Sequence, residues 1–225
     1  MIIKKNNSVE FLVGKNLDSK SKCLEVYNKK TLHFISDLGK LLKNKKNSKQ
    51  YPDVITFAFF CRKNNLDNFK KKYLRDSRVL RLGLGTIFHI TPSNIPTNFA
   101  YSLLFGLITG NSNIIKVPSK KFDQITMISN AINELLFKKK YFFLREMITI
   151  VRYSDNDEIT KKLSLKCDAR VIWGGDSTIN SLRKFPIPER SIDIPFADRY
   201  SACFLNSDKI IKLKDNSLQL LIQKF

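Results

Sequence analysis

The stretch HITPSNIPTNFAYSLLFGLITGNSNIIKVPSK, from His89 to Lys120, decides the fold of this chain. It opens at the end of a β-branched, apolar run, which predicts a strand, and passes two prolines into the almost wholly apolar segment 98–109, which predicts a buried helix. A Gly-Asn turn follows, and residues 111–117 predict a second strand. A strand, a helix and a strand at this spacing indicate a parallel βαβ unit.

The same alternation extends in both directions from this stretch. The segments 79–90, 146–153, 169–175 and 199–206 are apolar and β-branched and predict strands, whereas 122–138 and the segments that begin at Asp155, Asp176 and Ser207 predict helices. Strands that alternate with helices in this way predict an α/β fold with a doubly wound, Rossmann-like parallel sheet.

The first third of the chain has a different pattern. Apolar residues recur at the helical period up to about residue 44, a lysine-rich loop follows, and residues 51–74 predict two shorter helices. Pro52 sits where a first helical turn tolerates proline. We therefore expect a helical amino-terminal leader over residues 1–76 and an α/β domain over residues 77–225.

The charge balance is strongly basic. Lysine and arginine total 40 against 20 acidic residues, which gives a net charge of +20. Such a field favours anionic partners, namely nucleic acid, a membrane surface or phosphorylated small molecules. The alternative is a generally solvated basic surface that reflects the residue bias of an AT-rich genome. No nucleic-acid-binding motif is present, and the arginines are few and scattered, so we expect no nucleic-acid partner.

Cysteine and histidine usage indicates a compartment and argues against a metal site. The four cysteines are far apart and no secretory segment opens the chain, which predicts reduced thiols and a cytoplasmic location. The two histidines, His33 and His89, are isolated, so we expect no metal centre. The longest apolar run is too short to cross a bilayer, which predicts a soluble protein without a membrane span.

Ligands of open α/β sheets bind at the carboxyl ends of the strands. Three polar segments fall at such ends: 91–94, 116–120 and 174–178. In the third, two glycines precede Asp-Ser-Thr at a helix start, where free backbone N–H groups and the helix dipole favour an anion. An ordinary strand-to-helix turn with an Asp or Ser N-cap explains it equally well. The GxGxxG fingerprint of a classical dinucleotide site is missing.

Asn94 lies between Pro92 and Pro96, which restrict the backbone on both sides. An asparagine between a strand and a helix is commonly an N-cap. A rigidly held amide N–H at the end of a strand is also what an oxyanion requires, because an orientation fixed in advance stabilises developing charge.

Three segments carry a resemblance to a known family. Residues 85–120, RVIWGGDSTINSLRKFPIP and IDIPFADRYSACFL resemble the acyl-CoA reductase family that makes fatty aldehyde in bacterial luminescence operons. That family belongs to the aldehyde dehydrogenase superfamily, whose members carry a Pro-x-Asn-x-Pro turn and a Gly-Asn…Lys strand. The resemblance covers residues 78–206 and implies a cofactor-binding α/β domain of the aldehyde dehydrogenase type.

The resemblance also implies roles for individual residues. Asn94 takes the position of the oxyanion-hole asparagine. Lys116 takes the position of the lysine that binds the adenosine ribose. A hydroxyl and a cation at Ser119 and Lys120 suit a 2′-phosphate, which implies NADPH as the cofactor. Asp176 is expected to be a cap or turn residue. The nicotinamide side of the cofactor is assigned to Ile90, Thr91, Pro92 and Ser93, and the pyrophosphate to Gly174, Gly175 and Ser177.

The activity that the resemblance implies is NADPH-dependent reduction of long-chain fatty acyl-CoA, through an acyl-cysteine thioester, to fatty aldehyde. The acyl donor is acyl-CoA or an acylated protein, an acyl-protein synthetase is an implied partner, and the complete enzyme is expected to be a homo-oligomer. Phe196 replaces the glutamate base of many aldehyde dehydrogenases, which favours reduction over aldehyde oxidation.

None of the four cysteines matches the family's nucleophile. Cys203 is expected on a buried strand and Cys167 in a loop before one, both with structural roles. We therefore expect the chain to be the amino-terminal part of a longer reductase that binds cofactor without turnover. The alternatives are a basic nucleic-acid-binding module and a non-functional truncated gene product.

Overall fold

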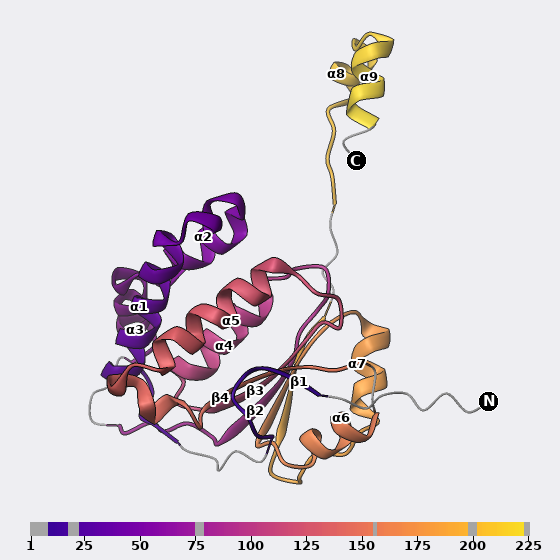
Figure 1. Ribbon diagram of the computed structural model, residues 1–225. Helices are drawn as coiled ribbons and strands as arrows, with labels where there is room; N and C mark the ends of the chain where they lie inside the picture. Colours follow the sequence, from indigo (N-terminus) through magenta and orange to yellow (C-terminus); the bar gives the residue numbers. More distant parts are fainter. Residues whose placement is uncertain (1–8, 18–22, 75–78, 155–156, 198–201, 223–225) are drawn as a thin grey trace, which may run out of the picture.

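The computed structural model describes residues 9–17, 23–74, 79–154, 157–197 and 202–222. A six-stranded sheet in the order β1-β4-β3-β2-β5-β6 lies between layers of helices (Figure 1). Neighbouring strands from β2 to β6 pair in parallel, whereas β1 pairs antiparallel with β4 at one edge. The predicted doubly wound α/β fold is confirmed. The strands are β1 Glu10–Val13, β2 Thr86–Ile90, β3 Ser112–Val117, β4 Ile148–Arg152, β5 Ala169–Trp173 and β6 Ile192–Phe196.

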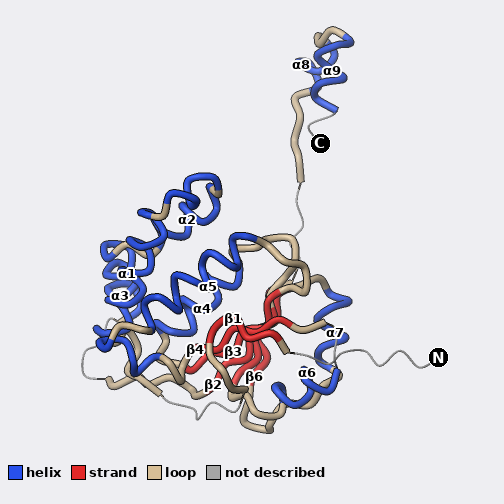
Figure 2. The backbone as a smooth tube through the Cα atoms, viewed as in Figure 1, coloured by secondary structure: helices blue, strands red, loops and turns tan. Residues whose placement is uncertain are grey.

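The helices form a layer on each face of the sheet (Figure 2). The helices α4 and α5 cover one face, α1 to α3 lie outside them, and α6 and α7 cover the other face. Their bounds are α1 Lys29–Asn44, η1 Lys46–Gln50, α2 Pro52–Phe60, α3 Lys63–Tyr73, α4 Asn98–Ile108, α5 Asp123–Leu136, η2 Lys139–Leu144, α6 Asp157–Ser164, α7 Asp176–Arg183, α8 Ser207–Ile211 and α9 Asp215–Ile222.

The four inner strands, β2 to β5, are buried on both faces, which is why their sequences are mostly apolar runs, whereas the edge strands β1 and β6 are partly exposed. On β3, Ile115 and Val117 join the larger core with α4 and α5, whereas Ile114 faces the smaller core that includes Leu163 of α6. Residues of α1, α2 and α3 belong to the same larger core as α4 and α5. The predicted leader therefore packs directly on the α/β layers, and its expected boundary at residue 76 lies outside the described residues.

Three sequence predictions need correction. The leader is not wholly helical, because Glu10–Val13 forms β1. The long apolar run 79–90 gives a strand only from Thr86 onward. The strand predicted at 199–206 is wrong: its described part, 202–206, is not a strand, and the sixth strand is β6, which precedes it. Cys203 is consequently exposed and does not lie on a buried strand.

The last two helices lie apart from the body of the molecule in Figure 1. No residue of α8 or α9 is buried, and several of their apolar side chains are exposed. The sequence prediction of one last helix near Ser207 therefore becomes two short helices, without a core partner for either.

The order of the strands reverses at β2. The chain runs from β2 to β3 and β4 on one side of β2, and then crosses to β5 and β6 on the other side. Loops that leave adjacent strands in opposite directions separate and open a crevice beyond their carboxyl ends. The carboxyl ends of β2 and β5 therefore flank the place where a sheet of this topology binds its ligand.

A buried ion pair joins β5 to β6. The guanidinium of Arg170 is almost fully buried and donates Nε and Nη2 to the two carboxylate oxygens of Asp193, at 2.8 and 2.9 Å. Its Nη1 donates to the Ser164 hydroxyl and to the Phe185 carbonyl, both at 3.0 Å. Because each nitrogen of the buried cation has an acceptor, the pair ties the edge strand to the loops around α6 and α7.

Asp193→Ala should lower the free energy of unfolding by about 3 kcal/mol, because it leaves the buried guanidinium without its carboxylate. Urea unfolding followed by circular dichroism measures the change. Asp208→Ala, which removes an exposed carboxylate on α8, is the matched control and should change stability by less than about 0.5 kcal/mol. Equal stability of the two variants would show that the Arg170 pair does not hold β6.

Candidate functional site

The predicted site segments leave three adjacent strands at the same edge of the sheet. Ile90 of β2 is in register with Lys116 of β3 on one side and with Ile172 of β5 on the other. Gly174 follows Ile172 by two residues. Since neighbouring strands are about 4.8 Å apart, the three loops that follow these residues begin side by side. All three segments thus border the strand reversal, where a sheet of this topology binds its ligand.

The loop after β2 is fixed at its root. The backbone N–H and the hydroxyl of Thr91 both donate to the carbonyl of Lys116, at 3.2 and 2.9 Å. Beyond it, Ser93 and Asn94 are exposed. The helix α4 starts only at Asn98, with Thr97 as its N-cap, so Asn94 is not the helix cap. Its side chain lies at the surface of the loop and is not turned into the protein interior.

The end of β3 carries one half-buried candidate, and the loop after it carries two exposed ones. Lys116 is half-buried, and its ammonium lies 5.0 Å from the centre of the Tyr153 ring. Ser119 and Lys120 are exposed, and the ammonium of Lys120 lies 5.2 Å from the centre of the Phe122 ring. The segment therefore presents two cations and a hydroxyl within five residues at the carboxyl edge of the sheet.

The loop after β5 enters α7 without a side-chain cap. Gly175 is the N-cap and has no side chain, and the first bond inside the helix runs from the Ile179 N–H to the Gly175 carbonyl at 3.0 Å. The N–H groups of Asp176, Ser177 and Thr178 precede that bond and have no acceptor within the helix. Asp176 is the first helical residue, so the alternative of an Asp or Ser N-cap is wrong.

A network of hydrogen-bonded side chains lies in the strands and the helix next to these loops. The sequence did not reveal it. His89 Nδ1 lies 2.7 Å from the Ser102 hydroxyl, and His89 Nε2 lies 3.0 Å from Asn113 Oδ1. The Asn113 amide nitrogen donates to the Asn111 carbonyl at 2.7 Å. Trp173 Nε1 donates to the Ser102 oxygen at 3.2 Å. The four side chains come from β2, β3, β5 and α4.

The donor and the acceptor of every hydrogen bond in this network can be assigned. Because the Asn113 NH₂ group is bound to a carbonyl, its oxygen faces His89, so His89 Nε2 must carry the proton. His89 Nδ1 is then an acceptor, and the Ser102 hydroxyl donates to it. The Ser102 oxygen in turn accepts the Trp173 indole N–H. Burial lowers the pKa of His89 to about 4, and the hydrogen bond with Asn113 offsets this only in part, so the ring is neutral near pH 7.

The network requires α4 to lie very close to β3. A Cβ atom on Gly106 would overlap the Asn113 side chain, so only glycine fits there. The helix ends at Ile108 with Thr109 as its C-cap, and the next residue, Gly110, has a φ of +81°, which favours glycine. The Asn111 carboxamide oxygen then accepts from the N–H groups of Leu84 and Gly85, at 2.6 and 3.2 Å, which aligns β2 with β3.

Trp173 connects the hydrogen-bonded network to the Gly174–Gly175 turn of the candidate site. It is the last residue of β5, immediately before Gly174, and it is the only tryptophan of the chain. Its indole is half-buried and stacks on the Phe196 ring, with ring centres 4.0 Å apart and an interplanar angle of 7°. The hydrogen bond to Ser102 and the stacked Phe196 ring hold the indole in one orientation directly before the Gly174–Gly175 turn.

The two buried cysteines have thiols with raised pKa values. Burial raises the pKa of the Cys61 thiol, and burial also raises the pKa of the Cys167 thiol to about 11 despite the nearby Arg170 cation. Cys167 donates to the Ser164 carbonyl, which fits the structural role predicted for it. Cys23 and Cys203 are exposed. Within the described residues, no group of three or more metal-binding side chains gathers, and no helix has the length and apolarity to cross a bilayer.

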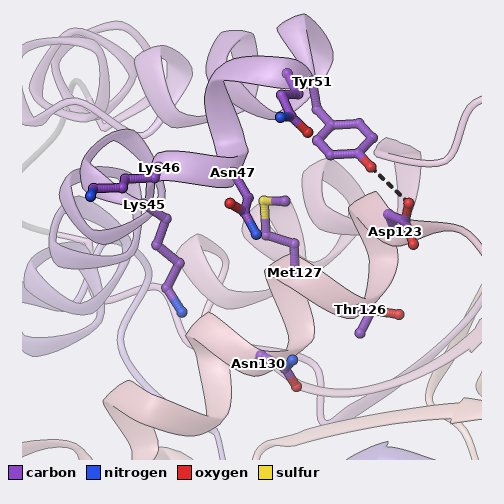
Figure 3. A pocket seen from close by; sticks show the side chains of 9 residues that line it. Lys45, Lys46, Asn47, Tyr51, Asp123, Thr126, Met127 and Asn130 are labelled. Atoms are coloured by element: carbon purple, nitrogen blue, oxygen red, sulfur yellow. Dashed lines mark hydrogen bonds between the residues drawn. The ribbon is translucent and has the colours of Figure 1, made fainter.

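A separate hollow of about 690 Å³ lies between η1 and the first half of α5 (Figure 3). The Tyr51 hydroxyl donates to the Asp123 carboxylate at 2.7 Å on one side, and Lys45 pairs with Glu134 at 3.1 Å on the other. None of the predicted site residues lines it. The lining residues are Lys45, Lys46, Asn47, Gln50, Tyr51, Asp123, Thr126, Met127 and Asn130.

Comparisons with known proteins identify a family and structures with a similar fold. A family model described as acyl-CoA reductase (LuxC) matches residues 24–219. No curated protein matches the chain. Among solved structures, a lactaldehyde dehydrogenase is similar with a TM-score of 0.57 at 13% identity, over 75% of this chain and 39% of that one. HpcC from Thermus thermophilus has a TM-score of 0.53 at 13% identity, over 75% and 36% of the two chains.

A betaine aldehyde dehydrogenase from Staphylococcus aureus, solved in complex with NAD⁺, has a TM-score of 0.50 at 19% identity, over 75% of this chain and 37% of that one. At these identities the likeness shows a shared fold. The chain spans less than half the length of each of these three structures.

The buried neutral histidine predicts a pH-dependent stability. Between pH 6.5 and pH 4 the unfolded chain binds a proton at His89 that the folded chain does not, so stability is present above pH 6.5 and is lost as the pH falls toward 4. We expect a loss of about 2 kcal/mol from this group between pH 7 and pH 5. Urea unfolding at the two pH values, followed by Trp173 fluorescence, measures it.

His89→Gln removes the titrating group and should remove this part of the pH dependence. His33→Gln, at an exposed histidine, is the control and should retain it. The assignment of His89 is wrong if the two variants lose stability equally between pH 7 and pH 5.

Proposed function

The chain belongs to the acyl-CoA reductase (LuxC) family, and we propose that it binds NADPH at the strand reversal and serves the reduction of a long-chain fatty acyl-CoA to fatty aldehyde. One observation carries the proposal: the last residues of β2, β3 and β5 and the loops that follow them, which together contain every predicted site residue, lie at the same carboxyl edge of the sheet. A mostly parallel sheet with this reversal is an established setting for dinucleotides.

The residues at this edge fit the chemistry of a dinucleotide. The uncapped start of α7 supplies backbone N–H groups and the positive end of a helix dipole, which suit a pyrophosphate. Gly174 and Gly175 leave the backbone open to approach, and Ser177 adds a hydroxyl. Lys116 lies on β3, on the other side of β2 from β5 and α7, where a ribose hydroxyl can accept a hydrogen bond from its ammonium.

Ser119 and Lys120 are the residues from which we propose a preference between NADPH and NADH. Both are exposed next to Lys116, and a serine hydroxyl with a lysine ammonium can bind a 2′-phosphate. A carboxylate at this place would instead repel the phosphate and accept hydrogen bonds from ribose hydroxyls. We therefore propose NADPH in preference to NADH.

Asn94 is the proposed donor to the acyl oxygen. When bound, the reduced nicotinamide supplies a hydride, and the segment Ile90–Ser93 would border its ring. The Asn94 side-chain N–H would donate to the carbonyl oxygen of the acyl group as negative charge develops there. Pro92 and Pro96 restrict the loop, and the two hydrogen bonds from Thr91 fix its root, so the amide is oriented before the substrate binds.

We propose that the thiol that carries the acyl group is none of the four cysteines of these 225 residues. Cys61 and Cys167 are buried with raised pKa values, and Cys23 and Cys203 do not lie on the three loops of the site. In this proposal the chain supplies the cofactor side of a longer reductase and does not turn over substrate by itself. The acyl donor, a synthetase partner, a cytoplasmic location and homo-oligomerisation belong to the same proposal.

NADPH binding is the first test, and Trp173 is its reporter. Titration of the chain with NADPH should quench Trp173 emission, because the fluorophore lies beside the proposed pyrophosphate turn, and NADH should bind about tenfold or more weakly. Lys120→Ala should weaken NADPH binding by about tenfold and leave NADH binding unchanged. The neighbouring exposed lysine gives the control Lys121→Ala, which should leave both affinities unchanged. Tighter binding of NADH, or no saturable quenching, would overturn the proposed cofactor.

Asn94→Ala separates catalysis from binding. It should leave NADPH affinity within about twofold, since the amide acts on the acyl oxygen, and should lower the rate of aldehyde formation on the order of a hundredfold when the chain is part of the complete reductase. Ile95→Ala, at an exposed neighbour in the same loop, is the matched control and should retain most of the rate. A normal rate in the Asn94 variant would remove this residue from the reaction.

A further inference from the structure

A second surface combines cations with exposed aromatic rings on the edge of the molecule opposite the candidate site. It lies between α5 and β4 in the sequence and includes η2. Because it directly precedes β4, it lies at the amino ends of the parallel strands. The rings of Phe137 and Phe142 are 77% and 46% exposed. We call this the η2 surface; it consists of Phe137, Lys138, Lys139, Lys140, Phe142 and Arg145.

The backbone that carries this surface is anchored in the core. Tyr141 and Leu144 are buried, and the Tyr141 ring meets the Phe34 ring of α1 edge-on at 5.2 Å. The Tyr141 hydroxyl donates to the Asp37 carboxylate at 2.7 Å. Because the residues on either side of Phe142 in η2 are anchored in this way, Phe142 is held at the surface by a rigid turn, and a partner would not have to order it.

The two exposed rings flank one guanidinium. Arg145 donates Nε to the Leu136 carbonyl at 2.8 Å, which fixes the side chain. Its guanidinium carbon lies 3.6 Å from the centre of the Phe142 ring and 5.6 Å from that of Phe137. The ring of Phe142 therefore has a cation over one face, while a large part of both Phe142 and Phe137 is exposed at the surface.

The charge around the rings is predominantly positive. Burial acts to raise the pKa of the Asp37 carboxyl, but hydrogen bonds from Lys140, Tyr141 and Lys40 outweigh it and lower the pKa to about 2, so Asp37 stays ionised and holds Lys140 at 2.8 Å. Lys138 and Lys139 are exposed and, within the described part of the chain, form no ion pair. Lys30 lies 5.9 Å from the centre of the Phe143 ring and extends the basic field along α1.

We propose that the η2 surface docks on an anionic lipid membrane, with Phe137 and Phe142 inserted at the headgroup level and the lysines bound to lipid phosphates. Aromatic rings flanked by lysine and arginine are suited to the membrane–water interface, where apolar contact and attraction to anionic lipid act together. A single-stranded nucleic acid is less well matched, because it stacks bases on free ring faces, and the Arg145 guanidinium covers one face of Phe142. Docking at this edge leaves the opposite, carboxyl edge of the sheet open to solvent.

Vesicle co-sedimentation of the 225-residue chain tests the proposal. The chain should bind vesicles of phosphatidylcholine mixed with phosphatidylglycerol and bind pure phosphatidylcholine far more weakly. The double variant Lys138→Gln with Lys139→Gln should reduce binding by about thirtyfold. The exposed consecutive lysines of α6 give the matched control, Lys161→Gln with Lys162→Gln, which removes the same charge from another face and should change binding by less than about threefold.

The aromatic part has its own variant and control. Phe137→Ser with Phe142→Ser should reduce binding by at least about tenfold, whereas Phe204→Ser, which removes a 94% exposed ring outside the η2 surface, should have little effect. Circular dichroism and thermal unfolding must match the parent chain, as expected for exposed positions.

Four outcomes would overturn the proposal. The first is no binding to anionic vesicles. The second is an equal loss in the two lysine variants, which would mean attraction by net charge alone, and the third is no effect of the phenylalanine variant. The fourth is tighter binding of a single-stranded oligonucleotide than of vesicles with loss in the same variants, which would assign the surface to nucleic acid.

Discussion

The pairing of β2 on both of its edges is the constraint on which the rest of this structure depends. Its backbone bonds in parallel to β3 on one side and to β5 on the other, so the strand is buried on both faces and cannot shift in register without disrupting both neighbours. The strand order reverses at β2, and the positions of the loops at the carboxyl edge depend on the register of this strand with β3 and β5. Below the loops, the bonds that join His89, Ser102, Asn113 and Trp173 hold β2, β3, β5 and α4 together.

The fold was predictable from the sequence because its elements have strong and distinct patterns. The buried strands are short apolar runs bounded by polar turns, α4 is an almost wholly apolar segment, and α5 is apolar at the helical period, so the βαβ order from Thr86 to Trp173 could be read directly. The edges were less predictable. Glu10–Val13 is four residues long and is a strand only because β4 is available beside it. The apolar segment ACFLN, at 202–206, has the composition of a strand but no neighbour to pair with, so composition alone misplaced the sixth strand.

The candidate site was predictable only in its outline. Polar segments at the ends of consecutive strands can be located without coordinates, since parallel topology brings those ends to one edge. The network beneath them could not be located in that way, because His89, Ser102 and Asn113 have ordinary helix- and strand-forming neighbours and meet only through tertiary packing. The glycine at 106 was the available signal: a residue without a side chain inside an apolar helix suggests that something approaches closely there. The basic, aromatic segment at 137–145 was visible in the sequence, but its exposure and the burial of Tyr141 and Leu144 are evident only in the structure.

The missing side chain at position 106 also limits how the molecule can move. The backbone of α4 lies directly against the Asn113 amide at Gly106. An axial slide or a rotation of this helix would move the side chain of Phe105 or Leu107 to this contact, where only the hydrogen atom of glycine fits. Shear between α4 and the sheet, a common way for layered proteins to open and close, is therefore blocked at its centre. Any rearrangement that admits a ligand must come from the loops at the rim, while the helix and the sheet behave as one rigid block.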